Sequence, residues 1–216
     1  MTPFRMPPRF RWNLPQTGAG EAEALSEALG ICAPVARTLI QRGYHDADAA
    51  ARFLAPSLDE LCDPLRMAGM REAVGRIAAA IHEREPILLF GDYDVDGVAS
   101  VVILKTAIER AGGTVRCQVP NRLREGYGLS EEAVAEAAAG GVKLLVSADT
   151  GIRATEAVIR ARALGVDVIV TDHHLPDAQL PPALAVLNPR RPDCAYPEKN
   201  LCGAGVVFRL VEALLA

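Results

Sequence analysis

The sequence predicts an α/β fold in which a mostly parallel sheet is flanked by helices and a small helical extension precedes it. Two observations lead to this prediction. After residue 86, short apolar runs alternate with helical patterns that end at glycines, as in parallel sheets covered on both faces. Before residue 71, the chain offers only a proline-rich start and short amphipathic patterns. We therefore assign an N-terminal arm and short helices to residues 1–70 and the α/β domain to residues 71–216.

The length and composition fit one large domain with an appendage. The chain has 216 residues, half of them hydrophobic, and no apolar run is long enough to span a bilayer. Its basic, proline-rich start lacks the apolar core of a secretory signal, which predicts a cytoplasmic protein. The 5 cysteines form no CxxC pair, which argues against a disulfide framework and a zinc site. A net charge of −4 still allows nucleic-acid binding, because an acidic metal centre can lower the total charge while a local basic groove binds the nucleic acid.

Helical patterns dominate the first part of the chain. Three amphipathic helices are predicted, at residues 21–30, 33–43 and 46–54. Gly30 and Gly43 stand where helix C-caps belong, and Asp46 can cap the third helix. We interpret the following residues, up to 70, as a proline-containing linker that leads into a helix ending near residue 85.

The second part of the chain alternates strands with helices. Strands are predicted at residues 87–90, 115–119, 144–147, 168–171 and 185–187. Helices are predicted at residues 98–111, 131–139 and 154–164, each followed by a glycine. This alternation is what favours a parallel sheet.

Every unusual polar cluster lies just after the carboxyl end of a predicted strand. The clusters are Asp92, Asp94 and Asp96 after the first strand, Asn121, Arg122 and Arg124 after the second, Asp149 after the third, and Asp172, His173 and His174 after the fourth. In open parallel sheets this edge is where ligands bind. The sequence therefore predicts a ligand site built from these loops.

Carboxylates and imidazoles together suit a hard divalent cation. Three aspartates at alternate positions raise one another's pKa unless a positive charge lies among them, and Mg²⁺ or Mn²⁺ takes such oxygen ligands. Two ions held this way can stabilise an in-line displacement at phosphorus, with arginines contacting phosphate. Each cluster also has an interpretation without a ligand. The aspartates can form a solvated acidic turn, one histidine can cap a helix while the other lies at the surface, and the arginines can be ordinary surface residues.

Four ordered motifs carry a family resemblance. GDYDVDG at 91–97, PNRLREGYGLS at 120–130, SADTGI at 147–152 and TDHH at 171–174 resemble successive motifs of the DHH phosphoesterase superfamily, and within it the RecJ family of single-stranded-DNA exonucleases. LCGAGVVF at 201–208 resembles that family's later glycine-rich segment, and the helical preface resembles it too. The resemblance covers nearly the whole chain.

The resemblance implies a two-metal centre. Asp94 and Asp96 each bind one Mn²⁺ or Mg²⁺ ion, Asp149 bridges the ions, and His173 ligates the second ion. Catalytic roles fall to His174, which contacts the scissile phosphate or assists its hydrolysis, and to Asp172. The remaining implied roles are metal-proximal for Asp92 and substrate-binding for Asn121, Arg122 and Arg124.

The function implied by the resemblance is metal-dependent 5′-to-3′ hydrolysis of single-stranded DNA in repair and recombination. Single-stranded DNA is the implied partner, with a helicase or a single-strand-binding protein as a candidate protein partner and no membrane. One alternative is a phosphodiesterase for oligoribonucleotides or cyclic dinucleotides, against which the helical preface counts. Another is an inactive scaffold, against which the intact Asp and His positions count.

Two departures from the family pattern bear on activity. Many superfamily members have a histidine where this chain has Phe90, so the first ion is expected to complete its shell with water or to bind weakly. The family also has a further metal aspartate and a C-terminal substrate-binding domain downstream, and neither is present here. We therefore expect the N-terminal part of a longer protein, which can be inactive as an isolated piece.

Overall fold

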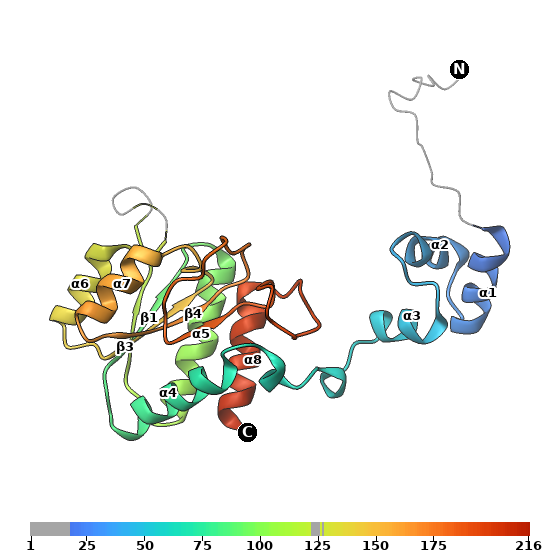
Figure 1. Cartoon of the computed structure of the whole chain (residues 1–216). Coiled ribbons are helices and arrows are strands. Elements are labelled where there is room, and N and C mark those ends of the chain that lie inside the picture. Colours follow the sequence, from blue (N-terminus) through green and yellow to red (C-terminus); the bar gives the residue numbers. More distant parts are fainter. Residues whose placement is uncertain (1–17, 122–125, 127) are drawn as a thin grey trace, which may run out of the picture. The chain divides into compact units, whose positions relative to one another are not determined.

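The computed structural model describes residues 18–121, 126 and 128–216. The chain forms two compact units, Met1–Leu61 and Cys62–Ala216. Figure 1 shows helices α1 to α3 in the first unit and the sheet with its covering helices in the second. Much of the predicted N-terminal arm lies outside the described residues, and the division into 1–70 and 71–216 stays a prediction.

The first unit is a small three-helix cluster. Its helices are α1 (Ala19–Leu29), α2 (Ala33–Gln41) and α3 (Ala47–Leu54). Leu25, Leu39 and Ile40 are buried among small alanines at its centre. Gly30 adopts the left-handed conformation at the C-cap of α1, and the Asp46 carboxylate accepts a hydrogen bond from Ala49 N at the start of α3. Both caps agree with the prediction from the sequence.

The segment interpreted as a linker ends inside the second unit. It contains two short 3₁₀ turns, η1 (Leu58–Glu60) and η2 (Pro64–Arg66). Met67 and Met70 are buried in the main core, where Met70 begins α4 (Met70–His82). The sequence did not predict that these residues join the core, because two buried methionines in a proline-containing segment form no helix or strand repeat.

The second unit is built on five parallel strands in the order β2-β1-β3-β4-β5. The strands are β1 (Ile87–Gly91), β2 (Val115–Gln118), β3 (Leu144–Ala148), β4 (Asp167–Thr171) and β5 (Ala185–Leu187). β1, β3 and β5 are buried along their whole length. Near-continuous apolar runs are therefore needed in these strands, because both of their faces are covered.

Alternate strand residues serve two separate hydrophobic cores. Leu89 and Ile169 pack with the first core and Leu88 and Val168 with the second. The first core lies under α4, α5 (Val95–Arg110) and α8 (Gly203–Leu215), and the second under α6 (Glu131–Ala139) and α7 (Thr155–Ala163); Figure 1 shows both layers. Full burial of each such side chain contributes about 1.5–3 kcal/mol. The predicted fold class is confirmed.

Helix α8 packs its apolar face into the first core. Val206, Val207 and Leu210 are buried in it, and the buried Arg209 donates to the carbonyl of Cys62 and pairs with Glu212. Among the helices in the described part of the chain, none has the length and apolar character needed to cross a membrane.

Candidate metal centre

The candidate site lies at the carboxyl edge of the sheet, where the strand order changes direction around β1. Three aspartates continue the sheet ladder there by donating their backbone N–H to the end of the next strand. Asp92 donates to Ala148 O (3.2 Å), Asp149 to Thr171 O (2.9 Å) and Asp172 to Leu187 O (3.0 Å). All three are buried. The backbone thus fixes these carboxylates at the edge where open α/β sheets bind ligands.

The loop after β1 turns directly into α5. The Asp94 carboxylate caps this helix, because its Oδ1 accepts from Asp96 N (2.9 Å) and Gly97 N (3.0 Å). A Cβ at Gly97 would lie 2.5 Å from Asp92 O, so only glycine lets the helix pass so close to the strand end. α5 consequently begins at Val95, whereas the sequence predicted residue 98, because the aspartates suggested a loop.

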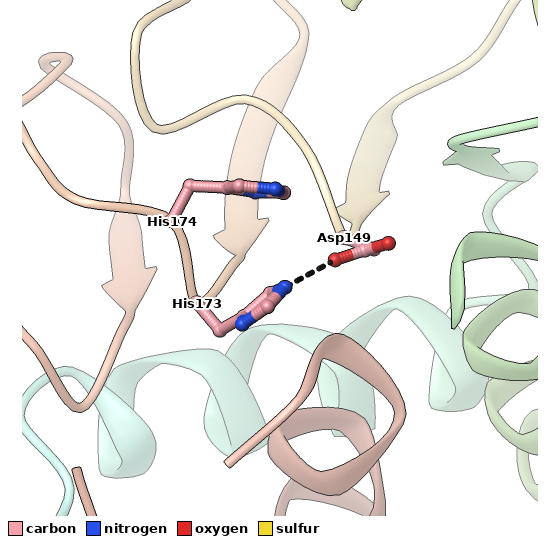
Figure 2. A group of neighbouring side chains, drawn as sticks. All are labelled: Asp149, His173 and His174. Carbon is pink, nitrogen blue, oxygen red and sulfur yellow. Dashed lines mark ion pairs between the residues drawn. The ribbon is translucent and has the colours of Figure 1, made fainter. Parts of the chain in front are cut away.

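Asp149 combines backbone strain with burial. Its φ is 63°, a left-handed conformation that is costly for a residue other than glycine. Its Oδ1 lies 3.1 Å from His173 Nε2, as Figure 2 shows, but accepts no hydrogen bond from the described residues. Burial, followed by the charges of Asp96 and Asp94, raises the pKa of Asp149 to about 7.

The pKa of Asp96 is shifted in the opposite direction to that of Asp149. Its Oδ1 accepts from Ala204 N and its Oδ2 from Gly203 N, each at 2.7 Å. Burial acts to raise the pKa of Asp96, but these two amides, the Cys202 side chain and the charge of His173 together outweigh it, and the pKa is lowered. Asp96 Oδ2 also lies 3.6 Å from His173 Nε2.

Asp172 organises the loop after β4. Its Oδ1 accepts from the backbone N–H of His173 (2.7 Å) and His174 (3.0 Å) and lies 2.7 Å from His174 Nδ1. Its Oδ2 accepts from Ile152 N at 3.0 Å. Because both oxygens are engaged within the protein, this carboxylate is suited to orienting its neighbours.

Within the described part of the chain, two three-residue groups could each hold a cation, and both include Asp149. One contains Asp92, Asp94 and Asp149, and the other contains Asp149, His173 and His174, with ligand atoms within 4.8 Å of one another in each group. Both histidine rings extend toward Asp149 (Figure 2). Neither group includes Asp96. Carboxylates, one or two imidazoles and a buried oxygen without a hydrogen bond fit Mn²⁺ or Mg²⁺.

The predicted substrate residues are only partly described. Asn121 is exposed, shortly after β2, whereas Arg122 and Arg124 lie outside the described residues. Beside the histidines, the structure has a cavity of about 480 Å³ lined by Gly128, Thr150, Arg153 and Arg190, among others. A cavity of this size can enclose a small ligand.

Sequence reasoning missed Asn188 and did not place the first residues of α8 at the site. Asn188 follows β5 and is fully buried; its Nδ2 donates to His174 O and its Oδ1 accepts from Arg190 N, each at 2.8 Å. Its position just after a strand, like that of the other polar clusters, was the signal that could have found it. Gly203 and Ala204 belong to the glycine-rich segment noted for its family resemblance, but their contact with Asp96 could not be predicted, because only folding brings them together.

The fold and the site together define an α/β protein with a candidate divalent-metal centre at a topological switch point. The family model described as "DHH family, N-terminal domain" matches residues 86–216. The chain belongs to the DHH family.

Curated relatives and solved structures agree with this assignment. The chain is 39% identical over 207 residues to the single-stranded-DNA-specific exonuclease RecJ of Bacillus subtilis, a match that covers 96% of this chain and 26% of the relative. It is 43% identical to RecJ of Escherichia coli, over 76% of this chain and 29% of that one. The structure of Thermus thermophilus RecJ in complex with Mn²⁺ superposes with a TM-score of 0.73 at 30% identity, covering 93% of this chain and 28% of that one. The chain thus spans between a quarter and a third of these relatives.

Proposed function

We propose that this chain carries the metal centre of an exonuclease that hydrolyses single-stranded DNA from the 5′ end, in DNA repair and recombination. The observation that carries the proposal is the position of Asp149, a buried carboxylate shared by two potential ligand groups. The identity to RecJ exonucleases of two bacteria supports the substrate class. An enzyme with this substrate meets chromosomal DNA in the cytoplasm, which is the location we propose.

The proposed cofactors are two Mn²⁺ or Mg²⁺ ions, as in the RecJ structures solved with each metal. Asp94 and Asp96 would each hold one ion, Asp149 would bridge them, and His173 would ligate the second. Asp92 would lie beside Asp94 and complete or orient the first group. When bound, such ions neutralise charge on the reacting phosphate and activate water.

His174 and Asp172 are the proposed catalytic pair. If Nδ1 of His174 donates to Asp172, as their 2.7 Å separation suits, the Nε2 atom is left to accept or deliver a proton at the substrate. The engaged oxygens of Asp172 keep this ring in one orientation. We assign contact with the scissile phosphate to His174, and Asp172 acts as the residue that positions it.

Substrate and protein partners extend the proposal. Asn121, Arg122 and Arg124 are proposed to hold nucleic-acid phosphates, since bidentate arginine contacts suit phosphate. A helicase or a single-strand-binding protein is the proposed protein partner, because single strands in cells arise from unwinding and are rapidly coated.

A second candidate function is hydrolysis of small nucleotides. The observation that favours it is the cavity of about 480 Å³ beside His173 and His174, which has room for a single nucleotide unit. The metal centre would be the same, so only the substrate length separates the two functions.

The experiment uses the complete gene product and single-stranded DNA labelled separately at each end. With Mn²⁺ or Mg²⁺, the proposal expects mononucleotides released from the 5′ end only, and no products with a chelator. Intact long strands alongside rapid cleavage of dinucleotides would instead support the second function.

A further inference from the structure

Helix α8 begins without a strong cap of its own. Its first residues are Gly203, Ala204 and Gly205, and its first turn contains no acidic residue. The residue in the capping position, Cys202, accepts a hydrogen bond from Gly205 N through its sulfur at 3.4 Å. Helix starts normally use Ser, Thr, Asp or Asn to satisfy the first backbone N–H groups. The N–H groups of Gly203 and Ala204 therefore need an acceptor from elsewhere.

Asp96 supplies that acceptor from the first turn of α5. Its two carboxylate oxygens each accept one of these N–H groups at 2.7 Å, although the residues are 107 and 108 positions apart in the sequence. A carboxylate at a helix N-terminus also gains from the helix dipole. Asp96 thus caps the start of a distant helix and is also a candidate metal ligand.

Gly203 also brings α8 against the second carboxylate of the centre. A Cβ at this position would lie 2.5 Å from Asp149 Oδ1 and 2.6 Å from Asp149 Cβ. Asp149 is 1% exposed, and its Oδ1 accepts no hydrogen bond from the described residues. The helix start therefore packs against a buried oxygen that accepts no hydrogen bond from the described residues and has the His173 ring as a polar neighbour, which points independently to a ligand at this place.

We propose that the N-terminus of α8 is a positioning element of the metal centre, in which Gly203 and Ala204 hold the Asp96 carboxylate and Asp96 in turn fixes α8. The capping part depends only on the contacts described above. The part that concerns metal affinity rests on the proposed function. Docking of α8 and the arrangement of Asp96 and Asp149 are then one coupled structure.

A simpler interpretation makes Asp96 a metal ligand only, and it has the opposite consequence for stability. Asp96 raises the pKa of Asp149 by charge repulsion, so removing its charge from a metal-free protein should relieve crowding and stabilise the fold. Under our proposal the same substitution removes the cap of α8 and destabilises it.

The first test is thermal unfolding of the metal-free chain in EDTA at pH 8, for wild type, Asp96→Asn and Asp96→Ala. We expect Tm to fall in that order, by about 2–4 °C for each cap bond lost, and amide exchange at Gly203 and Ala204 to accelerate in Asp96→Ala. An unchanged or higher Tm in Asp96→Ala overturns the proposal.

The second test is Mn²⁺ titration calorimetry of Gly203→Ala. We expect Mn²⁺ to bind at least about tenfold more weakly, because the added methyl group displaces Asp149. The matched control is Gly75→Ala in α4, where a Cβ meets nothing within 4 Å, and its affinity should equal that of wild type. Wild-type affinity in Gly203→Ala would overturn the metal part of the proposal. Absence of Mn²⁺ binding in the wild-type chain would instead contradict the proposed function, and the unfolding series would still decide the capping part.

Discussion

Oδ1 of Asp172 lies 2.7 Å from Nδ1 of His174 and also accepts the backbone N–H groups of both His173 and His174. One buried oxygen therefore fixes the backbone of the histidine pair and the ring of its second member. The pair itself is only partly buried, so its orientation depends on this carboxylate.

Replacing Asp172 with asparagine should destabilise the fold as well as stop catalysis. An amide in this position leaves at least one buried N–H group without its acceptor, which costs about 1–3 kcal/mol. Urea unfolding in the presence of EDTA measures the loss. The matched control is Asp177→Asn, an exposed side chain in the same loop, which should change stability little. Equal stability of the two variants would mean that Asp172 does not organise the loop.

Asn188 should act on activity through His174. Asn188→Ala removes the N–H donor to the His174 carbonyl and should lower kcat by about tenfold or more, while Mn²⁺ affinity stays close to that of wild type. Steady-state kinetics and metal titration measure the two effects separately. Asn200→Ala, an exposed asparagine nearby in sequence, is the control. Unchanged kcat in Asn188→Ala would remove Asn188 from the site.

Asp149→Ala in the complete gene product should lower the rate of hydrolysis by about a thousandfold or more, because both proposed ions lose a shared ligand. Binding of single-stranded DNA should persist, since it depends mainly on phosphate charge. Fluorescence anisotropy with labelled DNA and a product assay measure the two properties. Near wild-type activity would show that Asp149 does not hold the metals.

The raised pKa of Asp149 predicts a pH dependence of the metal-free fold. A carboxyl whose pKa is about 7 when folded and about 3.9 when unfolded favours the folded state below the unfolded value. That contribution, on the order of a few kcal/mol, is lost progressively as pH rises from the unfolded value through about 7. Asp149→Asn should lack this loss. Urea unfolding at pH 5 and pH 8 in EDTA compares the two proteins, and an identical pH dependence would contradict the raised pKa.

Metal binding should show the matching pH effect. Because the Asp149 carboxyl must release its proton before it binds a cation, Mn²⁺ affinity should fall by up to about tenfold per pH unit below about 7. Calorimetric titrations between about pH 6 and 8, roughly one unit either side of that pKa, measure the trend. Constant affinity across this range would show that the carboxyl is already ionised.

Local pattern was enough to predict most of the fold. Four of the strands are mostly apolar and buried, so their positions could be predicted to within a residue or so at each end. The start of α5 was missed because Asp94 and Asp96 suggest a loop, whereas Asp94 caps the helix and Asp96 lies in its first turn. The burial of Met67 was not predicted, because one buried side chain does not form a periodic sequence pattern.

The candidate site could be predicted as a set of loops but not as a geometry. The rule that ligands bind at the carboxyl ends of parallel strands is enough to bring Asp92, Asp149 and Asp172 to one edge from the sequence alone. The bonds from α8 to Asp96 could not be predicted, because they join residues far apart in the sequence and depend on how two helices pack. The roles of the individual metal ligands stay predictions.

The most direct test of the central role of Asp149 is electron paramagnetic resonance of Mn²⁺ bound to the wild-type chain and to Asp149→Ala. A spin-coupled pair of Mn²⁺ ions is expected in the wild-type protein, because one carboxylate bridges them, and that coupling should be lost in Asp149→Ala. Isolated, uncoupled Mn²⁺ in the wild type, or coupling that survives in Asp149→Ala, would contradict the bridging role given to Asp149.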